Sequence, residues 1–230
     1  MEFIRPRGTR DFLFDEMSNR KKVENILREI FENYAYKEVK TPIFENLSLF
    51  TSKSGDEIVK QLYTFKDKSE RELALRPEIT APVARLYINS LQKSLKPIKL
   101  YYFGSCFRYE RPQKGRFRQF WQFGCELIGA KSPQADAEII AMVYDSLKRL
   151  SVNAEIHINH LGIIRRLFNY FKIHKELQEK IMILIDKGDK QLLENEINNL
   201  LEDGETLKEI ILKLFNSIGD KTVLDNIEKY

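Results

Sequence analysis

The sequence predicts an α+β fold in which an antiparallel β-sheet is flanked by helices and followed by a small all-helical region. Short polar turns join several segments of strand character, which favours antiparallel pairing. Amphipathic helical patterns lie before, between and after these segments. From residue 172 onward the apolar residues follow helical spacing alone. We therefore expect two domains, residues 1–171 and residues 172–230.

The first predicted element is an amphipathic helix between Asp15 and Tyr36. Its apolar residues recur at intervals of three and four on one face: Val23, Ile26, Leu27, Ile30, Phe31 and Tyr34. Residues 37–40 then have the pattern of a short strand that ends at Thr41-Pro42. Because proline cannot donate to a ladder, we expect this strand to lie at a sheet edge or to end there.

Two further helices are predicted by the residues at their starts. Thr80 and Pro82 are residue types favoured at an N-cap and in a first helical turn, so a short helix is expected from there to Asn89. Ser132 and Pro133 form a second pair of this kind. The helical pattern that follows them continues to residue 150.

Further strands are predicted before the helix that begins at Thr80 and after the helix that begins at Ser132. Residues 61–66 and 71–76 have the pattern of a hairpin about a polar turn at residues 67–70. Residues 155–159 alternate between polar and apolar side chains, which predicts one more strand before a helix at residues 161–171. Beyond it, three helical stripes contain Leu177, Ile181, Leu184 and Ile185, then Leu192, Leu193, Ile197, Leu200 and Leu201, then Leu207, Ile210, Ile211, Leu214, Phe215 and Ile218.

The most informative segment, residues 99–127, consists of two predicted strands around a loop. The loop carries four basic residues and no acidic one: Arg111, Lys114, Arg116 and Arg118. Because alternate residues of a strand share a face, Arg108 and Glu110 are expected to point the same way. The same holds for Gln122 and Glu126 on the second strand. Cations and carboxylates beneath a basic loop suit a small ligand that carries both phosphate and ammonium groups.

The charge of the chain is unevenly distributed. The formal net charge is +4, but residues 172–230 hold 9 Lys, no Arg and 13 acidic residues, which leaves 29 basic and 21 acidic residues in residues 1–171. A basic body favours an anionic partner such as a nucleotide or RNA, and ordinary solubility charge is the alternative. Neither G-x-x-x-x-G-K nor G-x-G-x-x-G occurs, so side chains on a sheet would hold any nucleotide.

The two cysteines, Cys106 and Cys125, are expected on opposite faces of the hairpin and therefore unpaired. No Cys/His spacing resembles a zinc site, so no metal-binding residues are predicted. The apolar runs are too short for a transmembrane helix, and residues 1–12 lack the apolar core of a secretory signal. We therefore expect a protein of the reducing cytoplasm.

Four segments, in order, resemble the histidyl-tRNA synthetases, a class II aminoacyl-tRNA synthetase family. FRYERPQKGRFRQFWQFGCELIG at 107–129 is similar to the second signature motif of the family. PRGTRDF at 6–12 resembles the family's start, and LRPEITAPVAR at 75–85 resembles its amino-acid-binding segment. The first helix with Thr41-Pro42 resembles the first motif, which builds the dimer interface. The resemblance covers roughly residues 4–165.

The resemblance implies activation of histidine with ATP, with Mg²⁺ bound mainly through the ATP phosphates, and transfer of the histidyl group to tRNA(His). Arg108 matches the catalytic arginine that bridges the α-phosphate and the substrate carboxylate. Glu110 matches the residue that reads the adenine edge, and Arg116 the residue that reaches the terminal phosphate. Phe120 matches the aromatic residue that stacks on adenine.

The same resemblance implies a histidine site. Glu78, Thr80 and Gln122 match the contacts to the substrate ammonium group, and Glu126 matches the carboxylate that receives the imidazole N–H. An alternative for Glu78 is a carboxylate that stabilises a helix start.

The chain ends before the histidine-specific loop, the third signature motif and the anticodon-binding domain of the family. Residues 172–230 lie where the family carries a helical insertion that approaches the tRNA acceptor arm. We therefore expect the N-terminal part of a catalytic domain, which is poorly active alone. A homodimer is expected through the first helix and the Thr41-Pro42 strand.

Two alternatives remain. A non-catalytic regulatory subunit of the ATP phosphoribosyltransferase of histidine biosynthesis is expected to have lost Arg116 or the pair Arg108 and Glu110. A plain RNA-binding module needs neither Glu78 nor Glu126 on the pocket face.

Overall fold

A computed structural model describes most of the chain. The described residues are 3–52, 59–111, 113–187, 191–195, 205–216, 219 and 222. The chain divides into two compact units, Met1–Glu155 and Ile156–Tyr230. Each unit is described by itself below.

The first unit is built on a three-stranded sheet with the order β1-β5-β6. The long strands β5 (Ile98–Phe107) and β6 (Gln119–Ile128) pair antiparallel over their whole length, which confirms the predicted hairpin. The short strand β1 (Lys37–Glu38) lies at the sheet edge, as the following proline predicts. Its pairing with β5 is parallel, because the two strands are joined by a long crossover rather than a hairpin.

A second sheet in this unit has the order β2-β4-β3 and is antiparallel throughout. Its strands are β2 (Phe44–Asn46), β3 (Thr64–Lys66) and β4 (Glu72–Leu75). The predicted hairpin of β3 and β4 is confirmed. Its turn is closed by the Asp67 carboxylate, which accepts hydrogen bonds from the backbone N–H groups of Ser69 at 2.8 Å and Arg71 at 3.0 Å.

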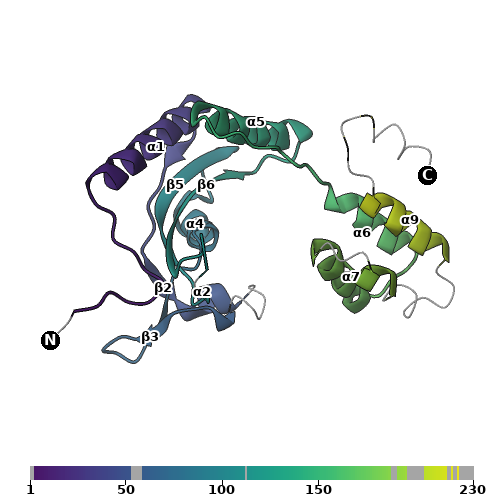
Figure 1. Cartoon of the computed structure of the whole chain (residues 1–230), viewed down its shortest axis with the longest axis horizontal. Coiled ribbons are helices and arrows are strands. Elements are labelled where there is room, and N and C mark those ends of the chain that lie inside the picture. Colours follow the sequence, from purple (N-terminus) through teal and green to yellow (C-terminus); the bar gives the residue numbers. More distant parts are fainter. Residues whose placement is uncertain are drawn as a thin grey trace. The chain divides into compact units, whose positions relative to one another are not determined.

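Two long helices cover one face of the β5–β6 hairpin (Figure 1). They are α1 (Phe14–Asn33) and α5 (Pro133–Arg149), and both were predicted. The Ser132 hydroxyl accepts a hydrogen bond from the backbone N–H of Ala135 at 3.4 Å, which confirms the expected N-cap of α5. The core beneath these helices contains Ile30, Phe31, Tyr36, Tyr101 and Met142.

The opposite face of the hairpin is covered by α4 (Thr80–Leu86), which continues into a π-helical turn, η1 (Tyr87–Leu91). The expectation that Thr80 is the N-cap is wrong. Ile79 occupies that position without a side-chain cap, because the Glu78 carboxylate takes the free N–H of Ala81 instead. A short helix, α2 (Leu47–Thr51), contacts α4 and the second sheet.

The second unit is helical in its described part. It contains α6 (Leu161–Tyr170), α7 (Lys175–Lys187) and α9 (Glu205–Asn216). These helices share a core of Ile164, Phe168, Ile181, Leu184 and Ile211 with Leu193, which lies in a further helical segment at residues 191–195. The predicted boundary at residue 171 places α6 in the first domain, whereas Ile164 and Phe168 are buried with residues of the later helices and α6 belongs to the second unit.

The strand expected at residues 155–159 is not formed, and that expectation is wrong. The alternating pattern is present, but no described strand pairs with this segment. The predicted stripe residues Ile197, Leu200, Leu201 and Ile218 lie outside the described residues. In the part of the chain that the structure describes, no helix is long and apolar enough to cross a membrane.

Candidate active site

Three of the predicted site residues share one face of the β5–β6 hairpin. Phe120, Gln122 and Glu126 each lie opposite an even-numbered residue of β5, in the interval from Leu100 to Cys106. Because cross-strand partners point to the same side of a sheet, these side chains face α4 rather than α1 and α5. The expected common face of Gln122 and Glu126 is thus confirmed, and Cys125 lies on the opposite face from Cys106.

Arg108 follows directly after β5 and adds one more rung to the hairpin. Its backbone N–H donates to the carbonyl of Arg118 at 2.9 Å. Its side-chain Nε donates to the carbonyl of Pro77 at 2.9 Å, and its guanidinium lies 5.1 Å from the centroid of the Phe120 ring. The Pro77 contact fixes the direction of the guanidinium fork while using one of its five N–H donors.

The prediction that Arg108 and Glu110 lie on the first strand is wrong. β5 ends at Phe107, and the backbone N–H of Glu110 donates to the carbonyl of Arg108 at 2.8 Å, so the chain turns between them. The Glu110 carboxylate lies 3.7 Å from the guanidinium of Arg116. The Arg116 side chain is 70% exposed, and such an exposed ion pair holds it only weakly. The two residues predicted to bind opposite ends of ATP therefore meet above the hairpin.

The start of α4 brings Glu78 to this face of the hairpin. Both carboxylate oxygens accept a hydrogen bond from the backbone N–H of Ala81, at 3.0 and 3.1 Å. This contact satisfies a donor that the first turn of a helix leaves free, and the positive end of the helix dipole favours a carboxylate there. Glu78 thus lies at a helix start, as the alternative expects, but it is half-buried rather than an exposed carboxylate. Its contact with a substrate ammonium group stays a prediction.

A chain of hydroxyl contacts joins Thr80 to Glu126. The Tyr102 hydroxyl donates to Glu126 Oε1 at 3.2 Å, and the Thr80 hydroxyl lies 3.4 Å from the Tyr102 oxygen. Because the Tyr102 hydroxyl donates its proton to Glu126, it accepts a hydrogen bond from the Thr80 hydroxyl. Burial, first, and the neighbouring carboxylates raise the pKa of Tyr102. Two residues predicted to contact different parts of histidine are thus linked through one buried tyrosine.

Sequence reasoning missed Tyr102, although a signal was present. Tyr102 lies opposite Gly124 in the hairpin, and a Cβ on Gly124 would lie 2.7 Å from the tyrosine oxygen. Its even-numbered position on β5 places it on the face of Gln122 and Glu126. Alternation applied to the first strand would have found it.

Gln122 is held by two donors. Its side-chain Oε1 accepts from the backbone N–H of Ile79 at 3.1 Å and from Cys106 Sγ at 3.4 Å. Because a backbone N–H can only donate, this contact fixes which end of the amide is oxygen. Burial raises the pKa of the Cys106 thiol to about 11, so the thiol keeps its proton at neutral pH. Both cysteines are free.

Sequence reasoning also missed Arg76, a buried arginine that ties the site together. Its side chain is 4% exposed. Nε donates to the carbonyl of Ser105 at 2.8 Å, and a terminal nitrogen donates to the carbonyls of Thr41 at 3.0 Å and Pro42 at 3.2 Å. The Arg76 carbonyl accepts from the backbone N–H of Phe107 at 2.9 Å. Arg76 therefore joins the segment before α4 to the strand end from which Arg108 emerges, and no local pattern indicates such a contact.

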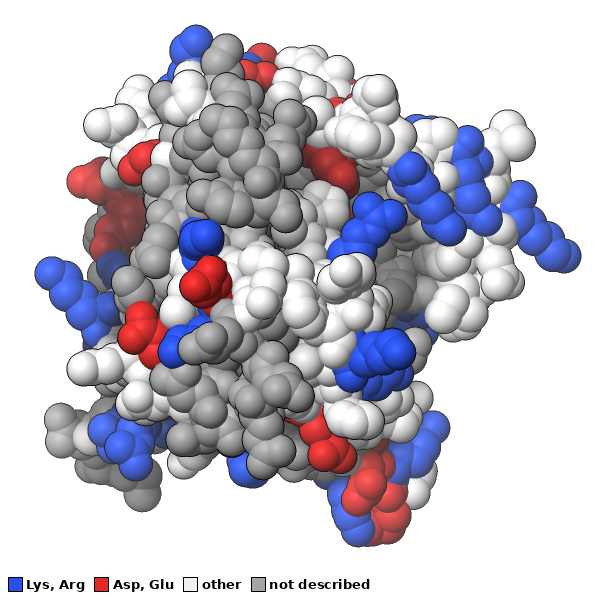
Figure 2. Space-filling view, turned by 90° about the vertical axis from the view of Figure 1, so that its right-hand side faces the viewer, with Lys and Arg blue, Asp and Glu red and all other residues white. Residues whose placement is uncertain are grey.

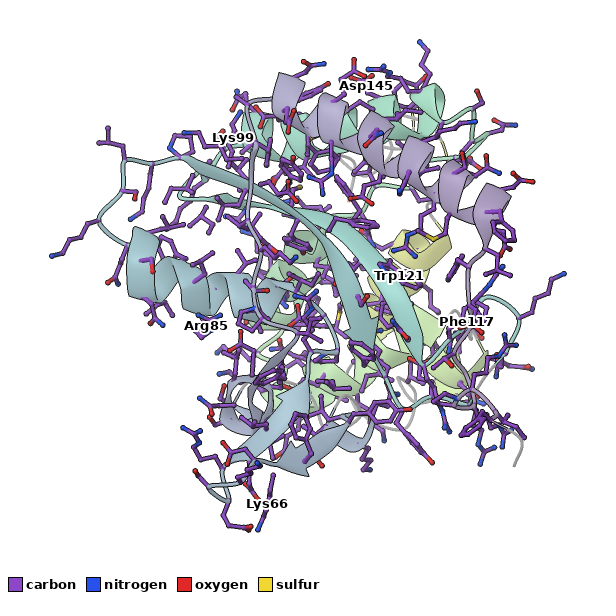
Figure 3. The ribbon with its side chains drawn as sticks, turned by 90° about the vertical axis from the view of Figure 1, so that its left-hand side faces the viewer. Lys66, Arg85, Lys99, Phe117, Trp121 and Asp145 are labelled. Carbon is purple, nitrogen blue, oxygen red and sulfur yellow. The ribbon has the colours of Figure 1, made fainter. Side chains whose placement is uncertain are left out.

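A cavity of about 700 Å³ lies on the other face of the hairpin, and none of the predicted site residues lines it. Within it the Arg20 guanidinium lies 3.4 Å from the centroid of the Trp121 ring. Trp121, on β6, is labelled in Figure 3. The predicted site is thus a sheet face with a loop at its end, and this cavity is a separate feature of the first unit.

Comparison with known proteins gives consistent matches. A family model described as histidyl-tRNA synthetase matches residues 8–230. The chain is 50% identical over 227 residues to a histidine–tRNA ligase of Methanocaldococcus jannaschii, in a match that covers 99% of this chain and 54% of that protein. It is 49% identical to the histidine–tRNA ligase of Archaeoglobus fulgidus, covering 100% of this chain and 55% of that protein.

Solved structures agree. Apo histidyl-tRNA synthetase of S. aureus is 43% identical with a TM-score of 0.56, over 64% of this chain and 35% of that chain. An ATP phosphoribosyltransferase regulatory subunit/histidyl-tRNA synthetase from Bacillus halodurans C superposes with a TM-score of 0.89 over 100% of this chain and 59% of that chain. It is 24% identical, so it shows the shared fold alone.

The family model matches nearly the whole sequence, and the chain spans about half the length of the curated relatives it matches. The segments that carry the match include the hairpin and the start of α4, whose side chains meet on one sheet face. This chain belongs to the histidyl-tRNA synthetase family.

Proposed function

We propose that this chain forms the ATP- and histidine-binding half of the catalytic domain of a histidine–tRNA ligase. One observation carries the proposal: residues predicted for the two substrates meet on a single sheet face. Arg108 and Phe120 lie at its loop end, and Gln122 and Glu126 follow along β6. Membership of the family supports the chemistry that this arrangement suits.

In the proposed reaction a carboxylate oxygen of histidine attacks the α-phosphate of ATP. A phosphorus–oxygen bond forms, the bond to the leaving pyrophosphate breaks, and histidyl-adenylate results. Negative charge on the phosphoryl oxygens grows toward the transition state, and a fixed guanidinium aimed at them stabilises it. Arg108 is suited to this role because Pro77 holds its Nε and leaves the rest of the fork for oxygen ligands.

The ATP side of the site is proposed around the loop after β5. Phe120 would stack on adenine, Glu110 would accept from the adenine amino group, and Arg116 would reach the terminal phosphate. The weak, exposed contact of Arg116 with Glu110 leaves that guanidinium free to move to a phosphate. We propose that Mg²⁺ enters bound mainly through the ATP phosphates, whose oxygen atoms are the ligands that Mg²⁺ prefers.

The histidine side is proposed around the start of α4. Glu78, Thr80 and Gln122 would receive the ammonium group, and Glu126 would accept the imidazole N–H. The Gln122 oxygen already receives the Cys106 thiol, but a thiol is a weak donor that an ammonium group can displace. Glu126 is half-buried and would be covered by the bound ligand, and a covered carboxylate left without its N–H partner by a wrong side chain is costly, so such a site can discriminate by about 10⁴ or more.

We also propose that the complete protein transfers the histidyl group to tRNA(His), with the second unit near the acceptor arm. Figure 2 shows lysine and arginine side chains projecting from the face in view, with acidic side chains among them. Positive side chains favour contact with an RNA backbone, and the excess of basic residues lies in residues 1–171, which hold 29 basic and 21 acidic residues, rather than in residues 172–230. Recognition of a particular tRNA also needs contacts to its bases.

A histidine-dependent ATP–pyrophosphate exchange assay tests the proposal. We expect exchange from a full-length protein that contains this chain, and far slower exchange from residues 1–230 alone. A full-length protein without histidine-dependent exchange would contradict the proposed activity and favour the regulatory alternative. Rapid exchange by residues 1–230 would contradict only the expectation of poor activity.

A further inference from the structure

The segment PRGTRDF at residues 6–12 has no role in the site described so far, yet its turn packs against the loop of the hairpin. The turn is closed by Thr9, whose backbone N–H and hydroxyl both donate to the carbonyl of Pro6, at 3.2 and 2.7 Å. Gly8 lies at its centre with a φ of +82°, a conformation that favours glycine. Gly8 and Thr9 are half-buried, whereas the residues on either side are exposed.

Gly8 touches the base of the basic loop at Arg118. The backbone N–H of Arg118 donates to the carbonyl of Gly8 at 2.8 Å. A Cβ on Gly8 would lie 2.7 Å from Arg118 Cγ and 2.8 Å from its Cδ, which is closer than two non-bonded carbon atoms approach each other. Residue 8 must therefore be glycine for two reasons: the positive φ of its backbone and the close approach of the Arg118 side chain.

Arg118 in turn closes the loop that carries the proposed ATP contacts. Its carbonyl accepts from the backbone N–H of Arg108 at 2.9 Å, and its Nε donates to the carbonyl of Glu110 at 3.1 Å. Its guanidinium lies 4.0 Å from the centroid of the Tyr109 ring. Arg118 thus holds the backbone of Arg108 and the backbone of Glu110.

We propose that the Gly8 turn is a positioning element for ATP, which acts through Arg118 on the loop that carries Arg108, Glu110 and Arg116. The inference rests on the proposed function of the same site. Residues 6–12 would then contribute to nucleotide binding without contacting the nucleotide themselves. The contacts proposed for the histidine ammonium and imidazole groups are held separately, by the start of α4 and by Tyr102, so that only the carboxylate contact of Arg108 is shared with the ATP side.

The separation predicts a selective kinetic effect. In a full-length protein containing this chain, Gly8→Ala pushes Arg118 away and displaces the loop. We expect the KM for ATP in pyrophosphate exchange to rise about tenfold, since small displacements of substrate-binding groups are costly, while the KM for histidine rises clearly less, because only its carboxylate contact uses Arg108. Thermal unfolding of the same preparation shows whether the variant is folded.

Gly129→Ala is the matched control. Gly129 also has a positive φ, +90°, and its added Cβ would lie 2.8 Å from a methylene carbon of Lys96. It follows β6 at the end of the hairpin where Lys99 lies, opposite the end that leads to Phe117 (Figure 3). A similar local strain at this position should leave the ratio of the two KM values unchanged. If Gly129→Ala changes the ratio as Gly8→Ala does, the inference is overturned.

A double-mutant cycle tests the route through Arg118. Arg118→Ala removes the two nearest of the three carbon atoms that a Cβ at residue 8 would meet, leaving only the Arg118 Cβ at 3.1 Å, and it also removes the bond to Glu110. We expect Arg118→Ala alone to raise the KM for ATP, Arg118→Lys to do so less, and Gly8→Ala to add under about twofold once Arg118 is alanine. Additive effects of Gly8→Ala and Arg118→Ala would overturn the inference.

The outcomes also distinguish this inference from the proposed function. A wild-type protein without histidine-dependent exchange refutes the function before any variant is measured. A wild-type protein with exchange, whose Gly8→Ala variant changes both KM values equally or neither, refutes the positioning role alone.

Discussion

At the level of single residues, the side chains proposed to bind substrates also hold the start of α4 against the hairpin. Gln122 accepts from Ile79, Glu78 accepts from Ala81 within α4, and Arg108 donates to Pro77 just before the helix. These contacts orient each side chain before any ligand arrives, which lowers the entropy lost on binding. Substitutions at these positions therefore change both stability and binding, and variants must separate the two.

Arg108→Ala is predicted to lower the rate of histidine-dependent pyrophosphate exchange of the full-length protein by about 10²–10³-fold, as expected for loss of one preorganised charge stabiliser. The Arg149→Ala variant, which removes a surface ion pair with Glu29, serves as control. A decrease below about tenfold for Arg108→Ala would argue against its proposed role.

Glu78 performs two tasks that two variants can separate. Glu78→Gln keeps an oxygen for the Ala81 N–H but removes the charge, so we expect a higher KM for histidine with little change in the unfolding temperature. Glu78→Ala also removes the contact at the helix start, which should cost about 1 kcal/mol of stability in urea unfolding. Equal KM values for wild type and Glu78→Gln would leave Glu78 with the structural task alone.

At the level of elements, a carboxylate on α5 joins the two long helices to the sheet. Glu138 accepts from Lys99 Nζ on β5 at 2.8 Å and from the hydroxyl of Tyr36, after α1, at 3.1 Å. Lys99 also donates to the carbonyl of Tyr34 at 3.3 Å. The Lys99 ammonium, first, and then the Tyr36 hydroxyl hold the pKa of Glu138 below its usual value near 4.5. The packing of α1 and α5 is thus linked to pH.

A group whose pKa is lowered by folding adds stability above its unfolded pKa, and this stability is lost as the pH falls through the folded pKa. Wild type should therefore lose stability below about pH 4.5, and Glu138→Gln should lose less over that range while being less stable at neutral pH. Urea unfolding between about pH 3 and pH 7 measures both effects. Glu70→Gln, in the exposed hairpin turn, controls for the loss of one charge. Parallel curves for wild type and Glu138→Gln would contradict the assignment.

Local patterns predicted most elements of the first unit, and their failures have identifiable causes. The stripe of α1, the polar turn before β4 and the Ser132 cap are formed by neighbouring residues, so the sequence contains them in full. The alternation at residues 155–159 is equally local, but a strand also needs a partner, and none of the described strands supplies one. Alternation likewise failed at Glu110, because the strand ends before it.

At the level of the whole molecule, exposed apolar side chains support the proposed homodimer. Ile43 and Phe44, which follow Thr41-Pro42, are 47% and 52% exposed, and the Phe44 ring packs against the ring of Phe65, itself 43% exposed. Exposed apolar side chains that form a large contiguous patch are typical of a contact with another molecule. We propose that a second copy of the chain covers these residues.

Sedimentation velocity is predicted to show a dimer for wild type and a shift to monomer for Phe44→Glu, because a charge buried in an apolar interface is costly. Ile88→Glu, at an exposed residue of η1 outside the proposed interface, should remain dimeric. Circular dichroism of each variant checks that it is folded. A wild-type protein that stays monomeric at high micromolar concentration would rule out the proposed dimer.

The sequence by itself determined most of the helices and strands of the first unit, and which side chains of β6 share a face, because helical spacing and alternation depend only on near neighbours. Only the tertiary structure placed the start of α4 over that face, linked Thr80 to Glu126 through Tyr102, buried Arg76 between three segments and brought Gly8 to Arg118. These contacts join residues far apart in the sequence. They depend on the paths of the connecting loops and on how whole elements pack, which no local pattern contains.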